Sequence, residues 1–177
     1  AMHETTFHPT AEKLARLAKL YQPSPDKRDL VPGSHWILDA TTGKPSPNPS
    51  GGLFSTATDL VRFYQMTLNG GELNGRRILS AKSVKEMTSL QSGELETGFT
   101  PGCGWGLGFC LVRKPQGPTK TLSVGSFGHG GAFGTQGWID PQRELICIML
   151  VQRAGFGNGD ASDLRSELQR VATSALK

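Results

Sequence analysis

Apolar side chains recur at three- and four-residue steps in four stretches of the chain, and this spacing predicts helices with one buried face. The first predicted helix follows Thr10, whose hydroxyl suits a helix cap, and its apolar stripe extends to Tyr21. The second follows Ser55 or Thr56, either of which supplies a cap, and Gly70 ends it in the usual way.

The third predicted helix is short and starts at Ser80, and the fourth starts near Ser162 and runs to the end of the chain. Thr56 and Asp59 have the spacing of a capping box, which strengthens the start of the second helix. The expected inward faces are Leu14, Leu17, Ala18 and Tyr21; Leu60, Phe63, Tyr64, Thr67 and Leu68; Val84 and Met87; and Leu164, Leu168, Val171, Ala172 and Ala175.

From residue 103 onward the pattern changes to that of strands joined by short turns. The turn at Pro141, Gln142 and Arg143 is tight, so the two strands that it joins are expected to be antiparallel. The predicted strands cover residues 105–112, 121–129, 134–140 and 144–151. Helices followed by a strand meander and a last helix predict an α+β fold, an antiparallel sheet flanked by helices.

The segment between positions 23 and 49 holds six of the eleven prolines. Proline removes a backbone donor and restricts the residue before it, so this segment is predicted to be extended and irregular. A short strand is expected at residues 35–39, and a long connection of this kind is usually functional or crosses a neighbouring surface.

Composition and charge narrow the function classes. The 177 residues suit one domain, and the net charge of +4 comes from acidic and basic residues that are mixed along the chain, so no nucleic-acid partner is expected. The longest apolar run, residues 145–151, is too short to span a bilayer. The three cysteines lack metal-like spacing and are expected to be buried free thiols: Cys103, Cys110 and Cys147.

Residues 125–140, GSFGHGGAFGTQGWID, place six glycines around one histidine, which requires special backbone angles or a close approach of something to the main chain. The segment does not match the phosphate-binding P-loop or the G-x-G-x-x-G pattern, because Phe133 stands where the last glycine belongs. It also lacks the G-x-S-x-G elbow, because with Ser126 as the serine of the pattern, Val124 stands where the first glycine belongs. The four scattered histidines predict no metal site, and no cofactor is expected.

Two literal matches to the nucleophile pattern S-x-x-K occur, at residues 24–27 and 174–177. The first lies among prolines in the irregular segment, and the second is the end of the chain, where order is poor. A pattern fixed at only two positions occurs often by chance, so neither is expected to supply a nucleophilic serine.

Three blocks resemble, in order, the carboxy-terminal half of the serine β-lactamase-like superfamily. They are PSGGLFSTATDLVRFYQMTLNGGELNGRRILSAKSVKEM, then GWGLGF, then GHGGAFGTQGWIDPQRELICIMLVQ. The superfamily includes class C β-lactamases, D-Ala-D-Ala carboxypeptidases, D-aminopeptidases and β-lactamase-fold esterases. The resemblance implies a partial β-lactamase/transpeptidase-like fold that lacks its amino-terminal part.

The resemblance also implies a site on the glycine-rich strand. His129, Gly130 and Gly131 match the H-x-G form of the family's third signature, in which His129 would contact substrate or hold the catalytic network in place. The glycines would let a substrate lie along the backbone, with Phe133 beside it. The backbone amide of Ala132 would be one donor of the oxyanion hole, worth about 3–4 kcal/mol of transition-state stabilisation.

The family's other signatures, S-x-x-K and Y-x-N, have no credible match in this chain. The resemblance therefore implies the carboxy-terminal part of a serine hydrolase for an amide, lactam or ester, inactive alone because the nucleophile is elsewhere. A non-catalytic module of the same fold, which binds a peptide or cell-wall fragment or associates with itself, is the alternative. An autonomous hydrolase with an unrecognised nucleophile is a third hypothesis.

The expected organisation is a single carboxy-terminal portion over residues 2–177, with Ala1 left from a tag. Its parts are a helix with the proline-rich segment (2–50), a helical segment (51–92), the meander (103–151) and the last helix (160–177). The expected partners are a small-molecule or peptide substrate and, through an open sheet edge at residues 144–151, the missing amino-terminal half or a second copy. No signal peptide is recognised, and both the cell envelope and the cytoplasm stay open as locations.

Overall fold

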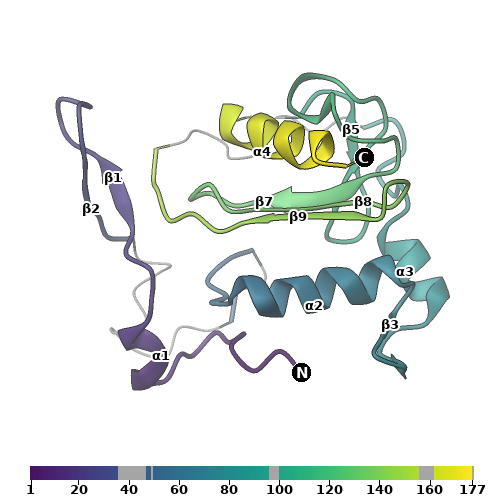
Figure 1. Ribbon diagram of the computed structural model, residues 1–177, viewed down its shortest axis with the longest axis horizontal. Coiled ribbons are helices and arrows are strands. Elements are labelled where there is room, and N and C mark those ends of the chain that lie inside the picture. Colours follow the sequence, from purple (N-terminus) through teal and green to yellow (C-terminus); the bar gives the residue numbers. More distant parts are fainter. Residues whose placement is uncertain (36–46, 49, 96–99, 156–161, 177) are drawn as a thin grey trace.

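The computed structural model describes residues 1–35, 47–48, 50–95, 100–155 and 162–176. Its centre is an antiparallel sheet with the helix α4 (Asp163–Ser174) on one face and the helix α2 (Ala57–Leu68) on the other, as Figure 1 shows. The predicted α+β architecture is therefore confirmed. No helix within the described residues is long and apolar enough to cross a membrane.

The sheet is a meander in which each strand pairs with the next one along the chain. Three of the four connections are short turns, the fourth (residues 113–126) contains a short 3-10 helix at Gly117–Thr119, and every pair is antiparallel. The strands, in their order across the sheet, are β5 (Cys103–Trp105), β6 (Cys110–Val112), β7 (Phe127–Gly130), β8 (Gln136–Asp140) and β9 (Leu145–Met149).

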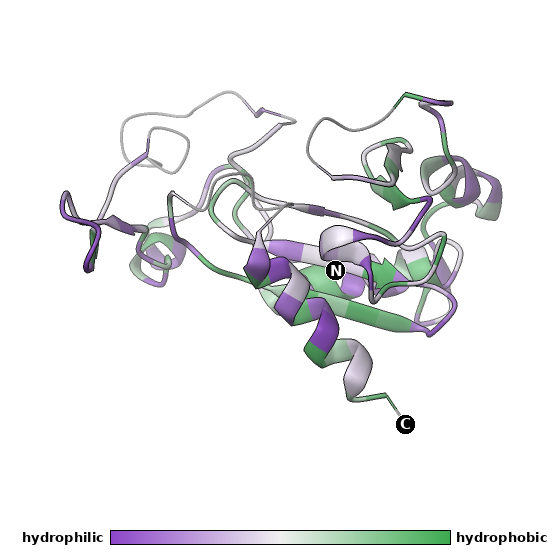
Figure 2. Cartoon of the chain, turned by 90° about the horizontal axis from the view of Figure 1, so that it is seen from above, coloured by the Kyte–Doolittle hydropathy of each residue, from purple (hydrophilic) through white to green (hydrophobic). Residues whose placement is uncertain are grey.

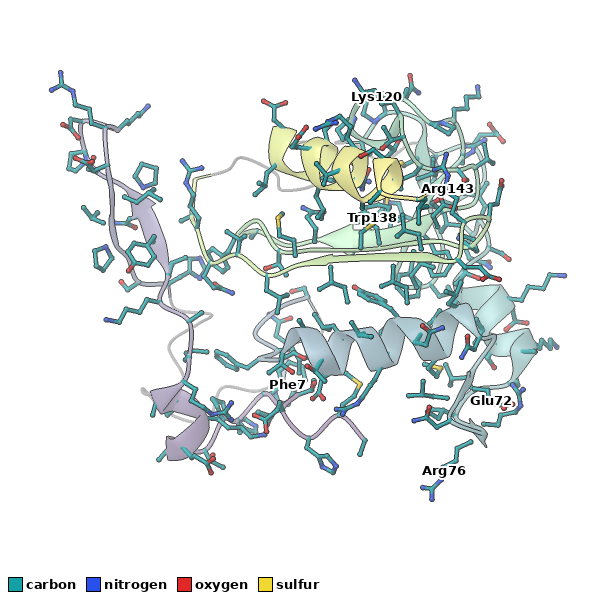
Figure 3. All side chains as sticks on the ribbon, in the orientation of Figure 1. Phe7, Glu72, Arg76, Lys120, Trp138 and Arg143 are labelled. Atoms are coloured by element: carbon teal, nitrogen blue, oxygen red, sulfur yellow. The ribbon has the colours of Figure 1, made fainter. Side chains whose placement is uncertain are left out.

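Successive strand residues point to opposite sides, so each face of the sheet carries its own apolar side chains, and a helix covers each face. In β8, Trp138 belongs to the cluster beneath α4, whereas the next residue, Ile139, belongs to the cluster against α2. Figure 3 shows Trp138 between the sheet and α4. Figure 2 shows the sheet mostly in the colour of hydrophobic residues. Burial of each large side chain in such a cluster contributes about 1.5–3 kcal/mol.

The helix α2 begins as its sequence predicts. Thr56 is the cap, and its hydroxyl accepts a hydrogen bond from the Asp59 amide at 3.3 Å. The Asp59 carboxylate does not close a capping box; it is buried and accepts instead from the Glu4 amide, the Thr5 hydroxyl and Arg62. The amino-terminal segment is thereby held against the start of α2.

Two further helices also start at their predicted caps. Ser80 caps α3 (Ala81–Met87), which buries Val84, and Ser162 caps α4. The predicted apolar face of α4 is only partly correct. Leu168 and Ala172 pack against the core, but the fully buried side chains of this helix are polar: Arg165 and Gln169.

The buried polar residues of α4 are compatible with the core because they have partners there. The Arg165 guanidinium lies over the Trp138 ring, with its carbon 3.7 Å from the ring centroid. In the amide orientation that satisfies both neighbours, Gln169 accepts from Arg165 at 2.9 Å and donates to the Pro118 carbonyl at 2.8 Å. Helical spacing of apolar residues alone could not reveal this pairing.

The first helix is shorter than predicted. The helix α1 covers only Ala11–Ala15, after the expected cap at Thr10, and it buries no residue. Tyr21 lies instead in a hairpin of β1 (Tyr21–Pro23) and β2 (Leu30–Pro32), which extends from one end of the molecule (Figure 1). Pairing of the Tyr21 backbone with residues 152–154 removes this segment from the helix.

Two strand predictions also need correction. Residues 105–112 form two strands rather than one, because the chain reverses after Trp105 and the amide of Gly106 donates to the Phe109 carbonyl at 2.8 Å. The segment 121–129 is a strand only from Phe127 onward. A small hairpin of β3 (Glu72–Leu73) and β4 (Arg76–Arg77) was not predicted, and the strand expected at 35–39 lies almost entirely outside the described residues.

Strand β9 lies at the edge of the sheet. Among the described strands it pairs with β8 alone, and its sequence, LICIM, is wholly apolar. Just past it, Leu150 is 44% exposed. An apolar edge with unpaired backbone groups is a template for pairing with another chain.

We expect the chain to self-associate through this edge. Leu150→Lys should shift the sedimentation-velocity profile towards the monomer, because a charge beside the edge opposes strand pairing. The matched control is Leu95→Lys, which changes a leucine that is 75% exposed and lies outside the sheet. An equal shift in both variants, or a wild-type chain that is strictly monomeric at every concentration, contradicts the prediction.

Candidate active site

The candidate site is the carboxyl end of β7. On one side, His129 and Gly130 pair with Gly137 and Gln136 of β8. On the other side, the pairing with β6 ends at Gly128. Since neighbouring residues of a strand direct their backbone groups to opposite sides, those of Gly130 face the outer side, where no described strand pairs with them and an extended ligand could lie.

A tight turn follows this edge. The Gly131 amide donates to the Thr135 carbonyl at 2.7 Å, and the Gly134 amide donates to the Gly131 carbonyl at 3.1 Å. Ala132 and Phe133 occupy the two central positions of the turn, and Ala132 is exposed. Within the described part of the chain, the Ala132 amide donates to no backbone or side-chain acceptor.

Two ring contacts enclose the turn and the end of the strand. The His129 and Trp105 rings have centroids 5.1 Å apart and planes tilted by 43°. Phe133 meets the ring of His35 edge to face, also at 5.1 Å. Both His35 and Trp105 come from segments distant in the sequence, so the aromatic rings that contact His129 and Phe133 are brought there by the tertiary structure.

An open cavity of about 1070 Å³ lies next to this region. His35 lines the cavity and also contacts Phe133, and Thr135 lines it from the start of β8. Most of the remaining wall is apolar and comes from the amino-terminal segment, the start of α2 and the residues after β9, including Leu14, Leu20, Leu53, Phe54, Leu60 and Leu150.

The glycines around His129 serve different physical purposes. A Cβ at Gly128 would lie 2.2 Å from the Gly137 carbonyl oxygen and 2.8 Å from the Trp138 ring, so strand β7 could not keep its place. Gly134 has a φ of +90°, in the region that favours glycine. A Cβ at Gly131 would meet only the Thr135 side chain, 3.3 Å away, so this glycine is less constrained sterically.

The S-x-x-K match at 24–27 is in the turn of the β1–β2 hairpin rather than at a helix start. Ser24 bonds Asp26 and the Asp29 amide there, and Lys27 has a φ of +59°. The other match ends at residue 177, which is outside the described residues. In the described geometry, Ser24 is therefore not arranged as an activated nucleophile.

The cysteines are not arranged as nucleophiles either. All three are buried thiols outside any disulfide, as predicted. Burial, with repulsion from the Asp140 carboxylate, raises the pKa of the Cys147 thiol to about 11. Since the thiolate is the reactive form, Cys147 is inert near neutral pH. Among the described residues, no cluster of three or more histidine, cysteine or acidic side chains could hold a metal ion.

Nearly the whole chain matches one protein family. The model described as Beta-lactamase matches residues 1–172, and the chain belongs to this family. Protein Rv1367c of Mycobacterium tuberculosis is 32% identical over 173 residues, which are 91% of this chain and 42% of that protein. Penicillin-binding protein 4 of Amycolatopsis lactamdurans is 37% identical over 92 residues, 51% of this chain and 22% of that protein.

The solved structures agree in fold. Simvastatin synthase (LovD) from Aspergillus terreus superposes with a TM-score of 0.72 at 17% identity, covering 98% of this chain and 46% of that one. The chain thus spans less than half the length of the relatives that it matches, consistent with the predicted partial β-lactamase/transpeptidase-like fold.

The residues at the end of β7 were expected in the site from the sequence, but two of their neighbours were not. Trp105 is half-buried and contacts both the core cluster and His129. His35 carried no signal beyond its residue type, because its contact with Phe133 joins segments almost a hundred residues apart.

We expect Gly128→Ala to lower the free energy of unfolding by about 3 kcal/mol, because the new methyl group collides with main-chain atoms of β8. Urea unfolding followed by circular dichroism measures the loss. Gly131→Ala is the control and should cost less than about 1 kcal/mol, since the Thr135 side chain can give way. Equal losses in the two variants would show that the approach of β8 is not the constraint.

Proposed function

We propose that this chain is the carboxy-terminal part of a serine hydrolase that cleaves an amide, a lactam or an ester through an acyl-enzyme. The end of β7 supplies one wall of the active site. The observation that carries the proposal is the outer side of Gly130, which no described strand pairs with, together with the exposed residue Ala132 two positions further on. Membership of the beta-lactamase family supports it.

The chemistry assigned to Ala132 is electrostatic. When a serine attacks a carbonyl carbon, negative charge develops on the carbonyl oxygen, and an N–H aimed at that oxygen stabilises the transition state. The Ala132 amide suits this role because its residue is exposed and its N–H donates to no acceptor among the described residues. The nucleophile and its base come from residues outside this chain. The region that holds them would pack against the β9 edge and the neighbouring cavity.

The substrate lies along the outer side of β7 in this proposal. Gly130 and Gly131 carry no side chain that would cover the strand, Phe133 borders the position of the scissile group, and His129 contacts the substrate or the catalytic network. The family relative named as a penicillin-binding protein supports an acyl substrate of the peptide or lactam kind, and the geometry of this strand end suits esters equally. The β9 edge would pair with the missing amino-terminal region or with a second copy.

We expect no covalent labelling of the purified chain by a fluorophosphonate or a fluorescent penicillin, read as intact mass. Both probes form adducts only with an activated serine. Denatured chain and a known serine hydrolase are the negative and positive controls. A stoichiometric adduct on one serine would show that the nucleophile is inside residues 1–177 and would overturn the partial-site proposal.

The oxyanion role is tested in the product of the complete open reading frame that encodes this chain. Ala132→Pro removes the N–H and should lower kcat by about 10²–10³-fold, while proline suits the second position of the turn. Ala132→Gly keeps the N–H and should retain most of the rate. Loss of activity in both variants, or in neither, contradicts the role assigned to this amide.

A further inference from the structure

One aromatic residue of α2 lies directly against the strand that pairs with the candidate site. We propose that this residue, Tyr64, is a positioning residue for the proposed reaction. Its ring fills the place of the side chain that Gly137 lacks, and it thereby fixes the backbone of His129 at the end of β7. Tyr64 does not touch the substrate in this scheme. The inference rests on the proposed function for its effect on catalysis, but the contact between Tyr64 and Gly137 is a property of the chain itself.

Gly137 lies at the tip of the Tyr64 ring. A Cβ at this position would lie 2.5 Å from the ring carbon that bears the hydroxyl and 2.6 Å from the adjacent ring carbon, and it would lie closer still to the hydroxyl oxygen. Any side chain at residue 137 would therefore need space that the ring occupies. The glycine and the tyrosine are complementary in volume, so a change in either residue alters the fit of the other.

The packing of α2 holds the Tyr64 ring in place. The ring packs against the core cluster that contains Phe127 and Ile139, and its centroid is 5.7 Å from that of Phe63. Burial raises the pKa of the Tyr64 phenol, so the hydroxyl stays protonated near neutral pH. Tyr64 is thus a neutral, fixed surface beneath β8, and its effect comes from its shape.

The ladder between β7 and β8 connects Gly137 to the site. Gly137 and His129 lie opposite one another in the register. The Gly131 amide donates to the Thr135 carbonyl, and the hydrogen-bonded pairs of an antiparallel ladder recur at every second residue, so His129 and Gly137 form such a pair. The position of Gly137 therefore sets the position of the His129 backbone, and Tyr64 acts on His129 through this one residue.

The same pair of strands is held on its other face by Trp138. The Trp138 ring lies against Gly128, which directly precedes His129, on the side of the sheet that α4 covers. A glycine in contact with an aromatic ring thus fixes each face of the sheet here, Gly128 towards α4 and Gly137 towards α2. After His129, β7 has only Gly130 before the turn that holds the proposed oxyanion donor. A shift of the strand pair would therefore move that donor.

Such a shift should affect the chemical step more than substrate binding. An oxyanion donor acts on charge that develops in the transition state. Displacement of a catalytic group by about 1 Å can lower the rate by about 10²-fold. The expected result is a fall in kcat with KM nearly unchanged, whereas a residue that only stabilises the core would lower the free energy of unfolding without this kinetic change.

The first test measures kinetics in the product of the complete open reading frame, with p-nitrophenyl butyrate and nitrocefin as the ester and lactam probes. Tyr64→Leu should lower kcat by about tenfold or more and change KM by less than about threefold. Tyr64→Phe keeps the ring and should retain most of the rate. An unchanged kcat in Tyr64→Leu overturns the proposed role.

The matched control for this test is Phe63→Leu. Phe63 is also a half-buried aromatic residue of α2 that packs against the same cluster, but the three atoms nearest to a Cβ at Gly137 all belong to Tyr64. Phe63→Leu should keep kcat within about threefold of the wild-type value. An equal fall in kcat in Phe63→Leu and Tyr64→Leu would show a general effect of core packing and would overturn the proposal.

The second test measures the contact itself by urea unfolding of the chain. Gly137→Ala should lower the urea midpoint in the wild type, because the new methyl group needs the space of the ring, and should have little effect in Tyr64→Leu, where that space is open. Gly128→Ala is the control and should lower the midpoint equally in both backgrounds, since its methyl group collides with main-chain atoms of β8. Additive effects of Gly137→Ala and Tyr64→Leu overturn the proposal.

The two proposals fail in different ways. If the proposed function is wrong, the complete protein does not hydrolyse the probes or Ala132→Pro is without effect, while the coupling between Tyr64 and Gly137 in urea unfolding is still measured. If only the present inference is wrong, Ala132→Pro lowers kcat as expected, but Tyr64→Leu lowers it no more than Phe63→Leu.

Discussion

The packing of Trp138 against Gly128 is the constraint on which the site depends. Trp138 is fully buried in β8, and its ring lies against Gly128 of the neighbouring strand, where a side chain would collide with it. The guanidinium of Arg165 covers the ring from α4. This contact accompanies the close approach of β7 to β8, in which His129 pairs with Gly137.

Beyond Gly128, the site depends on backbone groups of β7 that β6 does not pair with. Strand β6 stops pairing at Gly128, so no described strand pairs with the outer side of Gly130, and the turn that follows holds the exposed residue Ala132. Aromatic rings from two other segments, Trp105 and His35, border this edge. A rigid strand with an uncovered main chain and aromatic walls is well suited to hold an acyl group in register with a donor.

The sequence predicted those elements whose defining interactions join residues close together in the chain. The caps at Thr56, Ser80 and Ser162 are hydrogen bonds between residues three apart, so sequence reveals them directly. The helix predicted through Tyr21 failed because the Tyr21 backbone pairs with residues 152–154, a contact that no local pattern encodes. The strand predicted at 105–112 failed for a similar reason: its apolar residues belong to two strands that face each other.

The sequence by itself determined the order of helices and strands, the family, and the segment that carries the candidate site, because periodicity, caps and a glycine-rich motif are properties of neighbouring residues. Only the tertiary structure decided which strand edge is open, that Arg165 is a core residue, and that Trp105 faces His129. Each of these depends on contacts between segments far apart in the chain. Their energies come from burial and ring packing, which exist only once the sheet has formed.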